Sequence, residues 1–409
     1  MSTAQINSAT PDAASALTAQ WNDTPQAVDP IIALMQTYTD DVRPERANLG
    51  IGVYQDDLAE TPVMASVKEA EERILAAQRS KTYVGIGGDP ALVKAIGDEI
   101  FAPSTQWTGV QGVGGSGALR LIAEFCGTVS PDARLWVSDP TWGNHFALFD
   151  ASGLEVRRFP WGVHARDGIV DRALDALASA KPGDFVILHA CCHNPTGIDL
   201  PPEEERRLTD AINGRGLIPI IDAAYVGFAD GFEIDAQALG ALAAQFPLAF
   251  VAFSASKNFA LYRERVGVAF ITGADPARLA DWQTILLSAA RCAYSMPPDH
   301  GAASVLEILR DPALRGMWLD ELEAARSRVA RLRKAFASAL EEEGTIADAH
   351  FIAAGTGLFS LLPLTREQVI RLRTDHAIYM LENGRVNIAG LREESIPRVV
   401  SAISAVAST

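Results

Sequence analysis

Five short runs of uncharged, mostly apolar residues between about positions 105 and 275 constrain the fold of this chain more than any other feature. The runs are Leu135–Val137, Phe185–Leu188, Leu217–Ile221, Leu248–Phe253 and Val266–Ile271. Such runs are typical of strands buried on both faces, and amphipathic helical stretches separate them along the chain. Because alternating strands and helices build parallel β-α-β units, we expect a large α/β domain with a mostly parallel sheet.

The composition is that of a folded, acidic chain. Its 409 residues include 35 Lys and Arg against 51 Asp and Glu, which gives a net charge of −16. That balance excludes the generally basic surface on which nucleic acids and anionic lipids bind. Hydrophobic residues make up 48% of the chain, enough for a large core, and the length suits roughly two to three domains.

The cysteine content and the apolar stretches indicate the compartment. Four cysteines are too few for a disulfide scaffold in a chain of this length. The N-terminus lacks the basic and apolar regions of a secretory signal. One long uncharged stretch, residues 236–256, is interrupted by Pro247, and we interpret it as a helix over Ala236–Gln245 followed by a buried strand. We therefore expect a cytoplasmic protein without a membrane span.

Polar and aromatic side chains follow four of the apolar runs, where the predicted strands end. In α/β sheets, ligands bind outside the carboxyl ends of the strands. The residues that these four ends bring to one rim are Trp142, Asn194, Asp222 with Tyr225, and Lys257. Upstream, the glycine-rich sequence at Gly114–Ala118 opens a helical pattern, and a helix that begins this way offers bare backbone N–H groups to an anion.

Each of these residues also has an ordinary structural explanation. Lys257 would be a nucleophilic amine if desolvation lowers its pKa, but a surface lysine at a strand end is the commoner case. Asp222 could pair with a ring nitrogen or a metal, or it could cap the next helix. His189 and His193 lie beside two adjacent cysteines but lack a convincing second pair of ligands, so we expect no metal site.

Six motifs, taken together in one order and spacing, resemble a known family. They are GGSGAL (114–119), CCHNPTG (191–197), DAAY (222–225), SASKN (254–258), YRERVG (262–267) and NGRVNIAG (383–390). In this combination the chain resembles the class I pyridoxal-phosphate aminotransferases, and within them the aspartate and aromatic amino acid subgroup. The resemblance runs from about residue 28 to the C-terminus. It implies fold-type I, an α/β fold with a mostly parallel sheet of the seven-stranded type and a smaller α+β domain.

The resemblance also implies how the chain is divided. Residues 1–28 would be a flexible leader and N-terminal arm, and residues 62–325 the large cofactor-binding domain. Residues 29–61 together with 326–409 would form the small domain. Apolar periodicity predicts helices over Thr61–Ala77 and 302–343, and strands are expected near Gly357–Leu362 and Arg385–Ile388.

The cofactor that the resemblance implies is pyridoxal 5'-phosphate. Lys257 would bond to it covalently and then move the substrate Cα proton, while Asp222, supported by His145, would pair with the pyridine nitrogen. Tyr225 and Asn194 would hydrogen-bond the phenolic oxygen. Trp142 would stack on the ring, and both Trp142 and Asn194 would also contact the substrate. The residues that would hold the phosphate are Gly115, Ser116, Gly117, Ser254, Ser256 and Arg265.

The substrate residues follow from the same resemblance. Arg385 would bind the α-carboxylate, since a planar guanidinium matches a planar carboxylate, and Gly52 would lie on the turn beside it. Tyr83, which would contact the cofactor, and Arg291 match positions that reach into a neighbour's site. This implies a homodimer with shared active sites. Arg291 would contact the distal carboxylate of a dicarboxylic substrate.

Four departures from the aspartate enzymes widen the expected specificity: Gln55, Thr82, Gly143 and Met296. We therefore expect an aminotransferase that moves amino groups between aspartate or aromatic amino acids and 2-oxoglutarate. The mechanism would be ping-pong, with the cofactor alternating between its pyridoxal and pyridoxamine forms. The alternatives are a strict aspartate aminotransferase and a β-lyase type of reaction on the same fold. A transcription regulator would need a DNA-binding module, and no basic helical pair suggests one.

Overall fold

A seven-stranded sheet lies at the centre of the larger part of the molecule. The computed structural model describes residues 30–163, 168–346 and 348–407, so the predicted leader and arm over residues 1–28 lie outside the described residues. The strands are β2 (Trp107–Val113), β3 (Arg134–Asp139), β4 (Glu155–Pro160), β5 (Phe185–His189), β6 (Ile218–Ala223), β7 (Leu248–Ser254) and β8 (Val266–Gly273). Their order is β2-β8-β7-β6-β5-β3-β4, and only β8 runs antiparallel to its neighbours. The predicted mostly parallel α/β sheet is confirmed.

Two strands of this sheet escaped the sequence analysis, for different reasons. Strand β4 reads EVRRFP and pairs only with β3, so it lies at the edge of the sheet, where charged side chains remain in water. Strand β2 reads WTGVQGV, in which two glycines and a glutamine interrupt the apolar run. The five predicted strands all form, with ends shifted by one or two residues.

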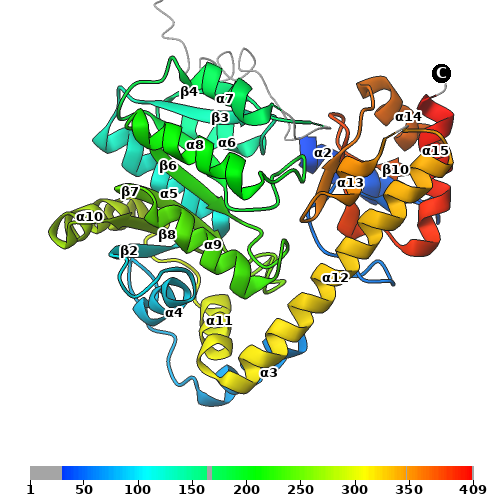
Figure 1. Cartoon of the computed structure of the whole chain (residues 1–409). Coiled ribbons are helices and arrows are strands. Elements are labelled where there is room, and N and C mark those ends of the chain that lie inside the picture. The colour runs from blue at the N-terminus through cyan, green and yellow to red at the C-terminus, as the bar shows by residue number, and fades with distance from the viewer. Residues whose placement is uncertain (1–29, 164–167, 347, 408–409) are drawn as a thin grey trace, which may run out of the picture.

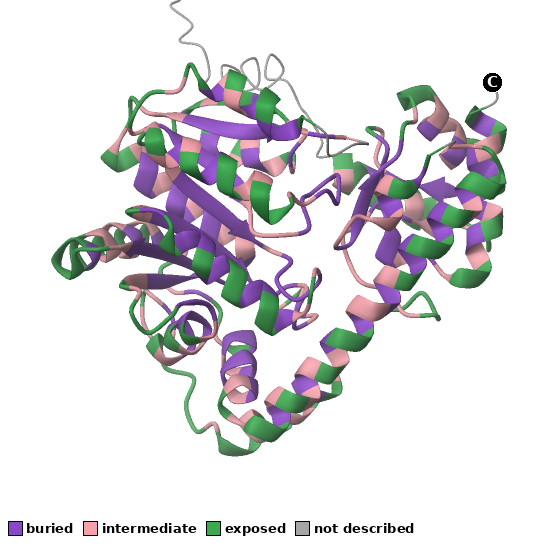
Figure 2. Ribbon diagram, in the orientation of Figure 1, coloured by how far each residue is buried: buried purple, intermediate pink, exposed green. Residues whose placement is uncertain are grey.

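Helices cover both faces of the sheet, and Figure 1 shows them in front of and behind the strands. Neighbouring residues of one strand pack into different cores: Ile220 and Phe250 lie with α5 and α10, whereas Ile221 and Val251 lie with α8 and α9. The helices in this part of the chain are α3 (Ala65–Ala77), α4 (Pro90–Ile100), α5 (Gly114–Val129), α6 (Asn144–Asp150), α7 (Ile169–Leu177), α8 (Pro202–Gly214), α9 (Phe232–Ala244), α10 (Pro276–Ala293) and α11 (His300–Arg310). Figure 2 shows the strands buried between these layers, which explains why their sequences carry so few charges.

The remaining elements gather around α12, the long helix that runs across the molecule in Figure 1. They are α2 (Pro30–Asp40), β1 (Ala47–Asn48), α12 (Pro312–Glu342), α13 (His350–Ala353), β9 (Phe359–Leu361), α14 (Arg366–His376), β10 (Ile378–Tyr379), β11 (Arg385–Asn387) and α15 (Ile396–Ala407). Strand β1 pairs with β10, and β9 pairs with β11. The two predicted strands near residues 357–362 and 385–388 are confirmed as β9 and β11.

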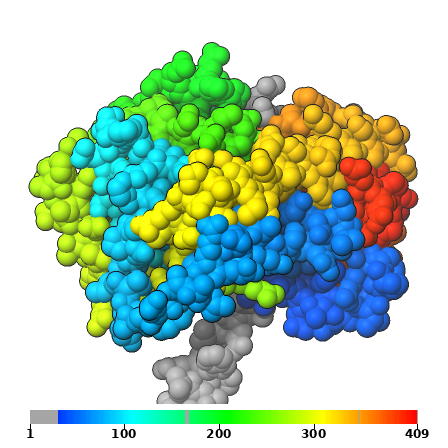
Figure 3. All heavy atoms as spheres, turned by 90° about the horizontal axis from the view of Figure 1, so that it is seen from below, coloured from blue at the N-terminus to red at the C-terminus, as the bar shows by residue number. Residues whose placement is uncertain are grey.

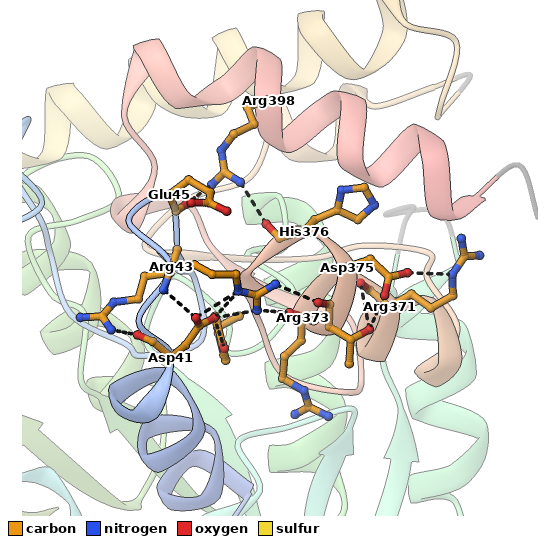
Figure 4. A network of polar contacts seen from close by, with 11 residues as sticks. Asp41, Arg43, Glu45, Arg371, Arg373, Asp375, His376 and Arg398 are labelled. Atoms are coloured by element: carbon orange, nitrogen blue, oxygen red, sulfur yellow. Dashed lines mark hydrogen bonds and ion pairs between the residues drawn. The ribbon is translucent and has the colours of Figure 1, made fainter.

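The N-terminal residues are tied to the C-terminal part by polar contacts. Arg43 donates to the carbonyl oxygens of Arg373 and Thr374 at 2.8 Å each, and Asp41 holds its guanidinium from the other side (Figure 4). Arg398 of α15 likewise donates to the Glu45 carbonyl at 2.7 Å. In Figure 3 the blue N-terminal residues accordingly lie beside the red C-terminal ones. These contacts join segments that are more than 300 positions apart in sequence.

Three predicted helices have different bounds from those expected. The helix expected over 302–343 is two helices, because Asp311 caps α12 through the N–H groups of Ala313 and Leu314, with Pro312 in its first turn. The helix expected from Thr61 begins only at Ala65. The helix expected over Ala236–Gln245 is α9, which starts four residues earlier. Across the described residues, no helix is long and apolar enough to cross a membrane.

Candidate active site

A cavity opens at the carboxyl ends of the parallel strands, between the sheet and the C-terminal elements. The residues that line it are Ile31, Gly52, Gly115, Ser116, Leu119, Trp142, Asn194, Asp222, Ala224, Tyr225, Ser254, Ser256, Lys257, Arg265, Phe359 and Arg385. The structure therefore gathers twelve of the fifteen site residues selected from sequence into one place.

 

The three predicted site residues that do not line this cavity are Tyr83, Gly117 and Arg291. Gly117 lies in the first turn of α5 and follows the lining residues Gly115 and Ser116 in sequence.

Asp222 is the penultimate residue of strand β6, and a chain of hydrogen bonds runs to it from His189 through Thr141 and His145. Burial lowers the pKa of His189 to about 4, so this ring is neutral at pH 7. Its Nδ1 accepts from the Asn194 N–H at 3.4 Å, so the proton is on Nε2, 3.3 Å from Thr141 Oγ1. Thr141 Oγ1 is also hydrogen-bonded to His145 Nδ1 at 2.9 Å, and His145 Nε2–H donates to Asp222 Oδ2 at 3.0 Å.

The ionisation of Asp222 depends on these partners. Burial raises its pKa, but the hydrogen bond from His145 and nearby positive charge outweigh that effect, so the pKa is lowered overall. Asp222 is therefore a carboxylate at neutral pH, although only 7% of the residue is exposed to water. A buried carboxylate facing a cavity can stabilise a cation there, such as a protonated ring nitrogen.

Lys257 lies just beyond β7, the strand next to β6, and its ammonium group faces the same cavity. Burial lowers the pKa of Lys257 to about 8; the charge of Asp222 opposes this shift, and Arg265 and Arg385 add to it. Its Nζ is 5.1 Å from the centre of the Tyr225 ring. A larger fraction of this amine is unprotonated at neutral pH than of an ordinary lysine, so it can act as a nucleophile or a base.

An anion cradle lies at the start of α5, where the first N–H groups of the helix have no carbonyl partner within it. Gly114 has φ +68°, and a Cβ there would lie 2.5 Å from Arg265 Nη2. A Cβ at Gly115 would lie 2.9 Å from that of Ser254. The two glycines therefore let a guanidinium and a serine approach the helix N-terminus. Arg265 Nη1 also donates to Ser256 Oγ at 3.3 Å.

Arg385 forms the opposite wall of the cavity and keeps part of its donor capacity free. Its Nη1 donates to Asn194 Oδ1 at 3.3 Å and its Nη2 to the Gly50 carbonyl at 2.8 Å. The buried Nε–H has no partner among the described residues. Burial lowers the pKa of Arg385 to about 10, so the group stays charged at neutral pH and can bind a carboxylate.

Asn194 joins this arginine to Tyr225. Its Nδ2 donates to the Tyr225 hydroxyl oxygen at 3.3 Å, while its Oδ1 accepts from Arg385. Burial raises the pKa of Tyr225 well above its usual value, so the hydroxyl keeps its proton and can donate to a ligand. Trp142 lines the cavity beside them, with its ring 5.3 Å from that of His145 in an edge-to-face arrangement.

Two predicted residues lie away from the cavity of the single chain. Tyr83 is 90% exposed, and Arg291 is exposed near the end of α10, where its Nη1 donates to Ser295 Oγ at 2.7 Å. The structure of one chain therefore does not bring them to the site.

The sequence analysis missed one prominent lining residue, Phe359. Its ring lies 4.2 Å beneath the Arg385 guanidinium, and a Cβ on Gly52 would approach it to 2.8 Å. Phe359 is in strand β9, and a phenylalanine in an apolar strand gives no signal that separates it from the core. Thr141, which connects His145 to His189, was also not selected.

The donor set fits a phosphorylated pyridine aldehyde. Such a molecule presents a phosphate, an electrophilic carbon and a basic ring nitrogen. The anion cradle with Arg265 suits the phosphate, and the Lys257 amine suits the electrophilic carbon. The Asp222 carboxylate suits the ring nitrogen. Among the described residues, no group of three or more His, Cys, Asp or Glu side chains could hold a metal ion.

Comparison with known proteins gives the same family throughout. The family model described as "Aminotransferase class I and II" matches residues 44–403. The chain is 41% identical over 392 residues to an aspartate aminotransferase of Salmonella typhi, covering 94% of this chain and 99% of the relative. It is 40% identical over 385 residues to an aromatic-amino-acid aminotransferase of Pseudomonas aeruginosa, covering 92% and 96%.

Solved structures agree with the sequence relatives. The crystal structure of an aromatic-amino-acid aminotransferase from Burkholderia pseudomallei, covalently bound to pyridoxal phosphate, superposes with a TM-score of 0.89. It is 36% identical in sequence, and the match covers 94% of this chain and 98% of that one.

Proposed function

The chain belongs to the class I and II aminotransferases, and from this premise we propose that it transfers amino groups between aspartate or aromatic amino acids and 2-oxoglutarate. The enzyme is a pyridoxal-phosphate-dependent transaminase acting on amino and 2-oxo acids. The observation that carries the proposal is one cavity in which a lysine of lowered pKa faces a carboxylate, an anion cradle and a free arginine donor. Relatives named for aspartate and for aromatic amino acids match almost equally well, which supports the double specificity.

The cofactor supplies the carbon that takes up the amino group and the ring that accepts the electron pair released at the substrate Cα. We assign Lys257 to covalent attachment and to moving the Cα proton, and Asp222 to keeping the ring nitrogen protonated. Tyr225 and Asn194 would hydrogen-bond the phenolic oxygen, and Trp142 would cover one ring face.

The phosphate and the substrate carboxylate are bound at opposite ends of the cavity in this assignment. The phosphate ligands are Gly115, Ser116, Gly117, Ser254, Ser256 and Arg265. Arg385 orients the substrate by its α-carboxylate, with Gly52 beside it, which selects the Cα bond that breaks.

We propose a homodimer whose two sites each borrow side chains from the other chain. Tyr83 and Arg291 are exposed on a single chain, and Tyr83 leaves a large aromatic surface in water that a partner would cover. Exposed Val84 and Ile86 lie in the same stretch. In the dimer, Tyr83 of one chain contacts the cofactor of its neighbour and Arg291 contacts the distal end of the substrate.

Two further assignments remain proposals. We propose that residues 29–61 with 326–409 form the small domain and residues 62–325 the large one, supported by the pairing of β1 with β10 and by the contacts of Arg43 with α14. We also propose a cytoplasmic location, since all four cysteines are free thiols.

The direct test is a panel of half-reactions, each with one amino acid and the cofactor-loaded protein, followed by changes in the cofactor absorbance. Aspartate, glutamate, phenylalanine and tyrosine are each expected to convert the cofactor to its amine form, and 2-oxoglutarate is expected to reverse the change. Conversion by aspartate and glutamate alone would identify a strict aspartate aminotransferase. Release of pyruvate and ammonia from a substrate with a β leaving group, without amino transfer, would identify a β-lyase.

The pH dependence of cofactor attachment tests the environment of Lys257. Because the pKa of Lys257 is lowered to about 8, its amine is mostly protonated and unreactive below pH 8 and mostly free above it. The rate at which the cofactor-free protein attaches pyridoxal phosphate is therefore expected to rise through pH 8 and then level off. Asp222→Ala removes a charge that raises this pKa, so the midpoint is expected to fall. A midpoint near the ordinary lysine value, or an upward shift in the variant, would contradict this account.

A further inference from the structure

The loop over residues 49–55 carries Gly52 at the cavity wall, and side chains from distant parts of the chain hold its carbonyl groups. Arg385 Nη2 donates to the Gly50 carbonyl at 2.8 Å, and Arg328 Nη1 donates to the Gln55 carbonyl at 2.7 Å. The Thr61 hydroxyl donates to the Tyr54 carbonyl at 3.0 Å. The loop has no helix or strand of its own over residues 50–55, so these contacts decide its shape.

Asn387 holds the two carbonyl groups on either side of Gly52. Its Nδ2 donates to the Ile51 carbonyl at 2.7 Å and to the Val53 carbonyl at 2.8 Å. The side chain is only 1% exposed, and its Oδ1 is buried without a partner in the described part of the chain. Both neighbours are acceptors, so only the amide nitrogen can serve them. Both N–H donors of the amide are used, but its oxygen has no partner among the described residues, and burying an unpaired oxygen is unfavourable. Filling the core alone would not require an asparagine here.

The register of strand β11 aims Asn387 and Arg385 at the same loop. Side chains two residues apart on a strand point to one face, so both donate into residues 50–53. Asn387 is also paired with Phe359 across the β9–β11 ladder. The Phe359 ring leaves no room for a Cβ on Gly52. Gly52 is thus enclosed by an amide, a guanidinium and an aromatic ring.

Two backbone donors of the loop have no hydrogen-bond partner among the described residues. The N–H groups of Gly50 and Ile51 both donate to Asn48 Oδ1, at 3.2 and 3.3 Å, whereas those of Gly52 and Val53 are unpaired there. Of these two, Gly52 lines the cavity that Arg385 also lines. The loop therefore brings an unpaired backbone N–H group to the cavity of the arginine assigned to the substrate carboxylate.

We propose that Asn387 is a positioning residue for substrate binding. By holding the carbonyl groups of Ile51 and Val53 on one nitrogen, it fixes the turn at Gly52 and so sets the spacing between the Gly52 backbone and the Arg385 guanidinium. This inference rests on the proposed function, in which that space receives the α-carboxylate. Since every amino acid substrate carries this carboxylate, Asn387 acts equally on all of them.

The test compares Asn387→Ala and Asn387→Ser with the matched control Asn383→Ala. Asn383 is exposed beside the same strand, and its side chain accepts from the Arg385 N–H without touching the loop. KM and kcat are measured with aspartate and with phenylalanine in cofactor-loaded protein, together with the cofactor absorbance. In Asn387→Ala both N–H donors of the amide are lost, which leaves two buried carbonyl groups without partners. We therefore expect KM to rise about 10-fold for aspartate and for phenylalanine, with a much smaller change in kcat. The serine variant keeps one donor and is expected to lie between.

The outcomes separate this inference from the proposed function. A parent enzyme that converts no amino acid overturns the proposed function itself. If the parent is active, the positioning role is overturned by unchanged KM values in Asn387→Ala. It is also overturned if KM rises for only one of the two amino acids. A fall in kcat alone overturns it too, as does failure of both Asn387 variants to fold with cofactor, because Asn387 would then be a purely structural residue. Equal KM changes in Asn383→Ala would also overturn it.

Discussion

Replacing Lys257 with alanine is expected to lower kcat by about 10²–10⁴-fold, the usual contribution of a general acid–base group, and to abolish covalent attachment of the cofactor. The physical reason is that, in the part of the chain that the structure describes, no second lysine lines the cavity to supply an amine. Cofactor binding itself should persist, because the anion cradle with Ser254, Ser256 and Arg265 does not depend on the lysine.

The measurement is borohydride reduction of the loaded protein followed by peptide mapping, with steady-state kinetics on the same preparations. In the parent, the cofactor is expected on the peptide that contains Lys257. Lys334→Ala is the matched control, since this lysine is exposed on α12. Trapping on another lysine, or full activity in Lys257→Ala, would show that the assignment of Lys257 is wrong.

Truncating Arg291 to alanine is expected to cost about 2–5 kcal/mol of transition-state binding for aspartate, as when one partner of a buried charged pair is removed. In kcat/KM this is a fall of roughly 30- to 5,000-fold. Phenylalanine should change far less, since an aromatic ring needs only apolar walls and no charged partner. Met296, whose Sδ accepts from the Val84 N–H at 3.2 Å, is flexible enough to accommodate both shapes.

The half-reaction with each donor must be measured alone, because 2-oxoglutarate also carries a distal carboxylate. Arg278→Ala on the same helix is the matched control, since Arg278 is exposed near the start of α10. Equal losses for aspartate and phenylalanine would make Arg291 a structural residue. The same variant tests the dimer: mixing Arg291→Ala with inactive Lys257→Ala chains should restore part of the aspartate activity if each site borrows Arg291 from the other chain.

Much of the catalytic rim could be predicted because strand ends are local features of the sequence. The runs at β5, β6 and β7 contain no charged residue before their last two positions, so the polar residues at and after those positions mark the ends of neighbouring parallel strands. Edge strand β4 carries a glutamate and two arginines, and the same reasoning therefore missed it.

Arg385 and Gly52 show the limit of that reasoning, because their neighbourhood depends on contacts across more than 300 residues. The bond from Arg385 to the Gly50 carbonyl joins positions 335 apart in sequence. Only the family resemblance suggested both residues, and no local pattern predicted the packing of Phe359 between them.

The sequence by itself determined the α/β class, the places of five buried strands along the chain and the residues at their ends, since each follows from hydrophobic pattern and motif spacing within short segments. Only the tertiary structure decided the ionisation of Lys257 and Asp222, because burial and neighbouring charges shift a pKa and both arise from distant segments. It also decided the chain of hydrogen bonds from His189 to Asp222 and the two bonds that Asn387 donates to the Gly52 loop. These depend on distances between atoms that the chain brings together only when it folds.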